Sequence, residues 1–318
     1  MCEIGGYIEL DKYTLPMLHD KAIKLNCGRN ALAYLIEAKR IESILMPKFM
    51  CDSCNGILKR YGVSVRYYSI DLNFRPIDII LKSGGREWLY LVNFYGQLSN
   101  EYIKKMQMLY RNIIVDQAQA YFQKPVVGVD TLYTCRKFFG VADGAILYSD
   151  KELRRTFEQD ESFERMHFLL GRFERTASEF YPEYAQNNDF FINEPIKKMS
   201  KLTENLLHGI DYEIVKKKRE KNFETLHDRL KKINKLKLTV PEGAFMYPLY
   251  VENGDFIRRE LQKKKIYIPI LWPDVFEICD ESELEFDMAK NILPLPIDQR
   301  YDLSDMELLS KEVMQYIG

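Results

Sequence analysis

The sequence predicts an α/β fold in which a mostly parallel sheet is flanked by helices, with a smaller α+β domain at the C-terminal end. The first observation is that short apolar runs, each fit for a buried strand, alternate with helically spaced segments from residue 44 to residue 148. Strands joined through helices of this length connect by right-handed crossovers and run parallel. The second is that shorter strands and helices follow a long helix near residue 211. We therefore expect a large domain over residues 1–210, including an irregular N-terminal arm, and a small domain over residues 211–318.

The regular structure of the large domain is expected to begin after the arm. Gly28 comes just before a helix that has Leu32, Leu35 and Ile36 on one face. Strands are then expected at 44–46, 63–70, 88–94, 113–115 and 145–148, and further helices at 51–61 and 101–110. Residues 181–183 and 186–189, within a charged and aromatic stretch, are expected to form loops.

The small domain is expected to open with a long helix from Asp211. The apolar residues of this helix recur at steps of three and four: Phe223, Leu226, Leu230 and Ile233. One face therefore packs, and the basic run at 216–221 is expected to face solvent. Strands follow at 237–240, 246–251 and 267–270, with a helix at 255–265. The final helix, 304–317, is expected to have Ser304 as its N-cap and Glu307 at the capping-box position.

Composition excludes several classes of protein. Among 318 residues, 46% are apolar and 29% are charged, with a formal net charge of -1, which argues against a broad nucleic-acid surface. No apolar run approaches the roughly 20 residues that cross a bilayer. The first ten residues carry Glu3 and Glu9 instead of a basic-then-apolar signal pattern, so we expect a cytoplasmic protein.

The cysteines are expected to be reduced, because the six of them are mostly scattered. Cys51 and Cys54 form a C-x-x-C motif, which is typical of thioredoxin-like redox sites and of half a zinc site. The sequence has no second C-x-x-C, and its four histidines are not at paired ligand spacing. We therefore expect no metal, and interpret the pair as structural or as part of the lining of a ligand crevice.

One stretch, from residue 113 to residue 149, carries the strongest chemical signal. A short apolar strand delivers Asp116 at its carboxyl end, where ligands of open α/β sheets collect, and Gln119 follows. Lys137 comes next, among the glycines 140 and 144. An acid that pairs with a pyridine nitrogen and a lysine that forms a Schiff base are what a pyridoxal phosphate site requires. Asp116 could also be the ribose-binding acid of a dinucleotide fold, but no G-x-G-x-x-G follows the first strand.

With these residues in place, the chain resembles the DegT/StrS-like nucleotide-sugar aminotransferases, which are fold-type I pyridoxal phosphate enzymes. The most specific match is the segment 115–120, Val-Asp-Gln-Ala-Gln-Ala, which keeps both the acid and the second glutamine. Further segments resemble the family at 28–32, 45–47, 93–97, 136–144 and 295–301.

The resemblance implies a role for each site residue. Lys137 is the catalytic Schiff-base lysine, Asp116 holds the proton of the pyridine nitrogen, and Gln119 contacts the phenolic oxygen of the cofactor. The cofactor phosphate is expected to be surrounded by Gly28, Arg29, Asn30 and Thr134.

The sequence also departs from the family at three places. The family often has a phosphate-binding serine five residues before the lysine, where this chain has Leu132, so Thr134 is the nearest hydroxyl. Where many members stack an aromatic ring on the cofactor, this chain has Cys51, with Phe49 as the near alternative. Ala145 replaces a common second glycine. These departures indicate a divergent branch.

The implied activity is transfer of an amino group from an amino acid, with glutamate as the expected donor, to a keto-sugar that carries a nucleotide. The resemblance also implies a homodimer, with residues 186–194 reaching across, and a place in surface-polysaccharide or other amino-sugar assembly. Two alternatives stay open: a sugar-modifying enzyme of another reaction type, such as a dehydratase, and a non-catalytic scaffold or regulator that binds the cofactor. The dehydratase relatives replace the lysine, so Lys137 favours transamination.

Overall fold

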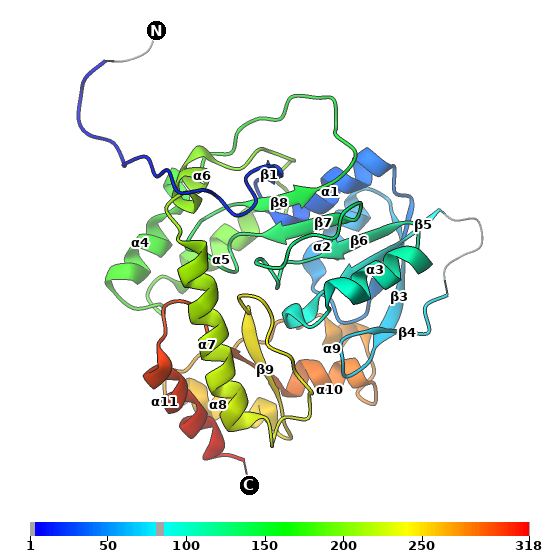
Figure 1. The fold of residues 1–318 in the computed structure, drawn as a ribbon, viewed down its shortest axis with the longest axis vertical. Helices are drawn as coiled ribbons and strands as arrows, with labels where there is room; N and C mark the ends of the chain where they lie inside the picture. Colours follow the sequence, from blue (N-terminus) through cyan, green and yellow to red (C-terminus); the bar gives the residue numbers. More distant parts are fainter. Residues whose placement is uncertain (1–3, 81–85, 318) are drawn as a thin grey trace.

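The computed structural model describes residues 4–80 and 86–317, and its central feature is an eight-stranded sheet within those ranges (Figure 1). The strand order is β1-β8-β7-β6-β5-β2-β3-β4. The strands are β1 (Ile23–Leu25), β2 (Ser43–Pro47), β3 (Ser64–Ile70), β4 (Pro76–Ile77), β5 (Glu87–Val92), β6 (Ile113–Asp116), β7 (Asp130–Thr134) and β8 (Ala145–Tyr148). The five strands from β7 to β3 run parallel, and β8, β1 and β4 pair antiparallel. The predicted, mostly parallel α/β sheet is confirmed.

Helices cover both faces of this sheet. Helix α2 carries the chain from β2 to β3, and α3 carries it in the opposite direction along the sheet, from β5 to β6. Right-handed crossovers in opposite directions place these helices on opposite faces. The helices of this part are α1 (Gly28–Lys39), α2 (Asp52–Arg60), α3 (Asn100–Leu109), α4 (His167–Glu174), α5 (Tyr181–Phe190) and α6 (Lys201–Leu207).

A second core lies around a small antiparallel pair, β9 (Met246–Tyr250) and β10 (Ile292–Pro296), in the lower half of Figure 1. Its helices are α7 (Tyr212–Leu230), α8 (Gly254–Lys263), α9 (Val275–Ile278), α10 (Leu284–Asn291) and α11 (Leu303–Met314). Asp211 accepts from the backbone N–H of Ile214 as the N-cap of α7. Phe223, Leu226 and Leu230 are fully buried, as the apolar spacing predicted.

Four local expectations were wrong. Residues 181–189 belong to helix α5, whose Pro182 sits in the first turn, where a missing N–H costs nothing. Residues 237–240 and 267–270 form no strand, and β9 pairs instead with β10. The cap of α11 is Asp302, which with Asp305 forms a capping box two residues before the expected one.

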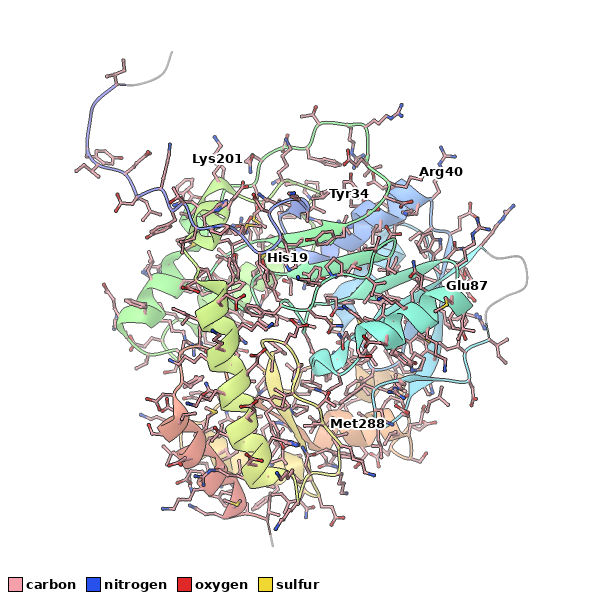
Figure 2. All side chains as sticks on the ribbon, viewed as in Figure 1. His19, Tyr34, Arg40, Glu87, Lys201 and Met288 are labelled. Carbon is pink, nitrogen blue, oxygen red and sulfur yellow. The ribbon has the colours of Figure 1, made fainter. Side chains whose placement is uncertain are left out.

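The N-terminal arm is anchored by a buried histidine, labelled in Figure 2. His19 bonds the carbonyl oxygen of Tyr121 at 2.8 Å and the hydroxyl of Tyr148 at 3.0 Å, and its ring lies 4.5 Å from that of Tyr133. Burial lowers the pKa of His19 from 6.5 to about 4. The folded protein therefore favours the neutral ring.

Because the His19 ring is buried in its neutral form, we expect the stability of the folded protein to fall in acid. A lowered histidine pKa gives stability that is complete above pH 6.5 and is lost as the pH falls from 6.5 towards about 4. The full loss corresponds to roughly 3 kcal/mol. We expect His19→Gln to flatten the decline of the melting temperature over this window. His167→Gln, which changes an exposed histidine, is the control; equal slopes in the wild type and His19→Gln would contradict the assignment.

Within the described residues, no helix combines the length and apolarity needed to span a bilayer.

Candidate functional site

Asp116 lies at the carboxyl edge of the sheet, as predicted. It is the last residue of β6 and is in register with Val92 of β5 and Leu132 of β7. Its side chain is buried and accepts two hydrogen bonds, from the hydroxyl of Tyr90 at 2.8 Å and from the backbone N–H of Ala118 at 2.7 Å. These two donors fix the carboxylate in one orientation.

The carboxylate of Asp116 lacks a neutralising ion pair among the described residues. Burial raises its pKa, while the charge of Lys137 and the two hydrogen bonds act in the opposite direction. No cation of the described chain lies within 4.0 Å of it. A buried carboxylate in this condition is stabilised by a cationic partner.

Lys137 lies in the loop that follows β7, close enough for its charge to act on both Asp116 and Cys51. The side chain is exposed, and its ammonium lies 5.7 Å from the ring centroid of Phe245. Within the described chain it has neither an ion pair nor a hydrogen bond. The structure thus brings the predicted acid and the predicted lysine within electrostatic reach of each other and leaves the amine without an ion pair.

Gln119 lies beside the end of β5. Its side-chain oxygen accepts from the backbone N–H of Tyr95 at 2.7 Å, which leaves the amide NH2 as its available donor. Tyr95 and Gly96 both have positive φ, 53° and 72°, so the chain turns sharply at this strand end. The turn is what presents the Tyr95 N–H to Gln119.

The N-terminus of α1 lies against the end of β7. A Cβ built on Gly28 would be 4.0 Å from the Cβ of Thr134. Leu132 pairs with Asp116 inside the sheet and is buried, whereas Thr134, two residues further, is the last residue of the strand. The register therefore places Thr134, and not Leu132, beside the helix N-terminus.

The side chains of Arg29 and Asn30 form hydrogen bonds with other residues of the chain. Arg29 donates to the carbonyl oxygen of Asn188 at 2.9 Å. The buried amide of Asn30 donates to the carbonyl oxygen of Pro195 at 2.7 Å and to Asn26 at 3.0 Å. Asn30 therefore holds the start of α1 in place.

Arg136 is a residue that sequence analysis missed. Its guanidinium donates to the side-chain oxygen of Asn188, so Asn188 holds both Arg136 and Arg29. Burial lowers the pKa of Arg136, and the neighbouring positive charges of Arg29 and Arg165 act in the same direction. Neither Arg29 nor Arg136 has a carboxylate within 4.0 Å among the described residues. Two guanidiniums without ion pairs, beside a helix N-terminus, are suited to the binding of an anion.

Arg219 is a second residue that was missed, because it lies in the basic run expected to face solvent. It is 1% exposed, and burial lowers its pKa to about 10. Arg219 donates to the carbonyl oxygen of Phe138 at 3.1 Å and to that of Ala244 at 3.0 Å, and Gln299 also donates to Phe138, at 2.8 Å. The carbonyl group of Phe138, the residue after Lys137, is thereby fixed to helix α7 and to the segment that follows β10.

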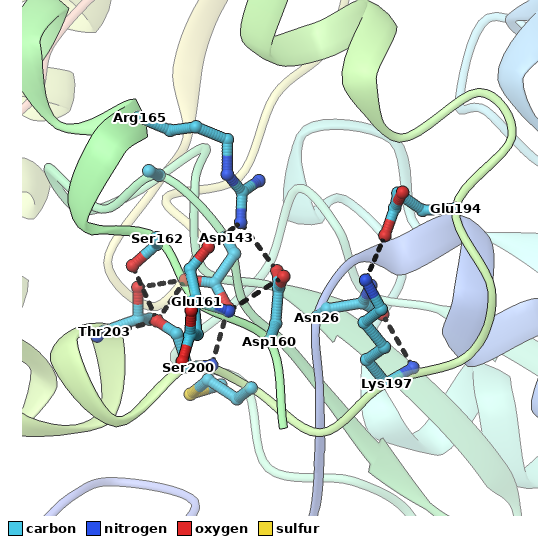
Figure 3. Close-up of polar contacts among 12 residues, drawn as sticks. Asn26, Asp143, Asp160, Glu161, Ser162, Arg165, Glu194, Lys197, Ser200 and Thr203 are labelled. Atoms are coloured by element: carbon cyan, nitrogen blue, oxygen red, sulfur yellow. Dashed lines mark hydrogen bonds and ion pairs between the residues drawn. The ribbon is translucent and has the colours of Figure 1, made fainter. Parts of the chain in front are cut away.

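Asp143 fixes the other side of the same loop (Figure 3). It accepts from the backbone N–H and the hydroxyl of Ser200, each at 2.7 Å, and from the hydroxyl of Thr203. Gly144 has φ +114°, and a Cβ there would lie 3.1 Å from both Cys135 and Thr203, so only glycine fits. The glycine-containing sequel of Lys137 is therefore a tight structural joint.

The two candidates for stacking on a cofactor ring lie in different environments. Phe49 is fully buried between Phe94 and Trp272, with ring centroids 5.3 Å and 4.2 Å away. Cys51 is partly exposed and feels the charges of Lys137 and Asp116. Cys51 is thus the candidate on the same side as the acid and the lysine.

Comparisons with known proteins give a structural likeness only. No family model and no curated protein matches the chain. A DegT/DnrJ/EryC1/StrS aminotransferase from Brucella abortus aligns with TM-score 0.61 and 15% identity over 96% of this chain and 92% of its own. Helicobacter pylori PseC, an aminotransferase of pseudoaminic acid biosynthesis, aligns with TM-score 0.61 and 13% identity over 96% and 92%. Bacillus subtilis NtdA with bound PMP aligns with TM-score 0.64 and 13% identity over 96% and 78%.

At these identities the likeness establishes the fold. The chain shares the fold of these three proteins, and it spans most of the length of each neighbour. The predicted fold class is confirmed.

Proposed function

We propose that this chain is a pyridoxal phosphate-dependent aminotransferase, which moves an amino group from an amino acid, with glutamate as the expected donor, to the keto group of a nucleotide-linked sugar. The observation that carries the proposal is the meeting of Asp116 and Lys137 at the carboxyl edge of the sheet. The neighbours support it, since two of those named above are aminotransferases and the third was solved with PMP.

The side chains of the site fit pyridoxal phosphate. Asp116 is a buried carboxylate without an ion pair, which suits a pyridinium nitrogen. Gln119 has an amide donor left for the phenolic oxygen. The phosphate would be held at the α1 N-terminus by the N–H groups of Gly28, Arg29 and Asn30, with Thr134 and the unpaired guanidinium of Arg136 beside it.

Each residue of the site would then have a separate role in the reaction. The cofactor, when bound, supplies the electron sink that stabilises negative charge at the substrate carbon. Asp116 would hold the proton of the ring nitrogen. Lys137 would supply the amine that holds the cofactor and, when free, would move a proton as base and acid. Arg219 and Gln299 keep the loop of Lys137 in place during these exchanges.

The absorption spectrum of the purified protein tests this proposal. Protein loaded with pyridoxal phosphate should have a visible band, L-glutamate should bleach it, and borohydride should fix the label on Lys137. A band that no amino acid bleaches would favour the scaffold alternative. Failure to bind the cofactor at all would exclude both the aminotransferase and every other function that depends on pyridoxal phosphate.

The anion site predicts a difference between two forms of the cofactor. We expect Arg136→Met to weaken the binding of pyridoxal phosphate about tenfold or more, because a charge-assisted hydrogen bond is worth about 1.5–3 kcal/mol. The binding of pyridoxal, which lacks the phosphate, should be unchanged. Quenching of protein fluorescence measures both affinities. Arg172→Met, a change at a more exposed arginine, is the control; equal losses for both ligands would contradict the phosphate contact.

We also propose that the protein is a cytoplasmic homodimer that works in amino-sugar assembly, and that its domains meet near Asp211. Asn187 and Asn188 were expected to reach across a dimer. Within their own chain, the side chain of Asn187 donates to the carbonyl oxygen of Ala142, and Asn188 accepts hydrogen bonds from Arg29 and Arg136. Light scattering of the eluting protein measures the oligomeric state.

A further inference from the structure

The C-x-x-C cysteines have surroundings that a purely structural role leaves unexplained. Cys51 is the N-cap of α2, and the backbone N–H of Cys54 donates to its carbonyl oxygen at 3.4 Å. A turn of this kind brings its first and fourth Cα atoms within about 7 Å. Disulfides form without backbone movement at Cα separations of about 4.4–6.8 Å. The two thiols are free and already placed to be joined.

The two thiols differ in a way that suits thiol exchange. Cys51 is partly exposed, with its sulfur 2.9 Å from the hydroxyl of Ser53, whereas Cys54 is buried. A hydrogen bond from Cys54, assisted by Lys137 and Ser53, lowers the pKa of Cys51 to about 6, although burial and Asp116 act in the opposite direction. The hydrogen bond that the Cys54 thiol donates to Cys51, together with the burial of Cys54, raises the pKa of Cys54 well above its ordinary value. An accessible thiolate beside a protonated partner is the arrangement of an attacking and a resolving cysteine.

We propose that Cys51 and Cys54 are a reversible dithiol–disulfide pair that exchanges with small-molecule disulfides of the glutathione type. The Cys51 thiolate attacks one sulfur of the small disulfide, and the other half leaves and takes up a proton as a thiol. Cys54 then gives up its proton and attacks the Cys51 sulfur, which releases the second small thiol. The cysteine pair loses two electrons and two protons, and the small disulfide becomes two thiols.

The pair is linked to the acid of the site. The Cys54 sulfur lies 3.9 Å from the hydroxyl of Tyr90, and this hydroxyl donates to Asp116 at 2.8 Å. A disulfide removes the S–H of Cys54 and draws its sulfur towards Cys51, which changes the environment of the Tyr90 hydroxyl. This consequence rests on the proposed function, because Asp116 acts through the bound cofactor; the exchange reaction itself does not.

Peptide mass spectrometry of the native full-length chain tests the exchange. After equilibration with oxidised and reduced glutathione and rapid alkylation, we expect a Cys51–Cys54 disulfide while Cys27, Cys135 and Cys279 stay reduced. Iodoacetamide should label Cys51 at pH 7 about tenfold or more faster than Cys279, whose thiol burial keeps protonated. Cys54→Ala should stop at a glutathione adduct on Cys51. Equal labelling rates, or no adduct and no disulfide in the native chain, would overturn the proposal.

The link to Asp116 is tested on the protein loaded with pyridoxal phosphate. Oxidation should shift the visible band, dithiothreitol should restore it, and Cys279→Ala should respond as the wild type does. A disulfide that forms without any change in the band overturns the link to Asp116. A disulfide that forms in a chain unable to bind the cofactor supports the dithiol pair while it removes the proposed function, so the two failures are distinguishable.

Discussion

Replacement of Lys137 by alanine is expected to abolish the amino-donor half-reaction and the borohydride label while leaving the fold intact. Lys137 would supply both the covalent hold on the cofactor and the proton transfer, so the half-reaction with L-glutamate should slow by about 10⁴-fold or more. The side chain is exposed and has no ion pair among the described residues, so the free energy of unfolding should change by no more than about 0.5 kcal/mol. Stopped-flow absorbance and thermal melting measure the two effects.

A matched surface variant separates the role of Lys137 from a general effect of charge. Lys124 is exposed and lies between β6 and β7, whereas Lys137 follows β7, so Lys124→Ala should keep the wild-type half-reaction and label. If Lys137→Ala still bleached with glutamate at the wild-type rate, a different lysine would hold the cofactor.

The parallel core of the fold could be predicted because its strands are continuous apolar runs. Segments such as 44–46, 113–115 and 145–148 are buried on both faces, so each run marks a strand to within one or two residues. Strand β10 was missed because it contains Pro294 and Pro296, which a strand tolerates in a two-stranded pair where one edge is unpaired. Helix α5 was missed because polar residues cover most of its surface and only Asn187 is buried.

Some residues of the candidate site could likewise be predicted from the sequence, and others could not. Asp116 could be found because it ends an apolar strand, and Lys137 because a glycine-containing segment follows it; strand β7, which delivers Lys137 to the same sheet edge, was not predicted. Arg219 could not, because its burial depends on carbonyl groups from Phe138 and Ala244, which come from distant parts of the chain. Its helix spacing offered one signal: Arg219 lies one turn before the buried Phe223, on the packed face. Arg136 was hidden by its partner Asn188, in a segment expected to be loop.

Replacement of Asp116 by asparagine is expected to uncouple cofactor capture from turnover. Asparagine keeps an oxygen for the N–H of Ala118 but carries no charge to retain a proton on the pyridine nitrogen. Lys137 should still take the borohydride label, while the glutamate half-reaction should fall on the order of 10²–10³-fold, as when one preorganised electrostatic group is removed. Asp130→Asn is the matched control: this buried carboxylate of the adjacent strand β7 pairs with Lys39 at 2.9 Å, so its loss should cost stability and spare the half-reaction.

The same variant makes a prediction about stability, with a definite sign. Burial raises the pKa of Asp116 above 3.8 in the folded, cofactor-free protein, so ionisation of this group opposes folding. The penalty is absent below pH 3.8, where both states are protonated, and it grows as the pH rises through the raised folded pKa. Cofactor-free Asp116→Asn should therefore melt higher than the wild type at pH 7 and equally at pH 3.5. Loading with pyridoxal phosphate should reverse the order at pH 7, since only the wild type gains the ion pair. If the loaded variant still melted higher, Asp116 would not be the partner of the ring nitrogen.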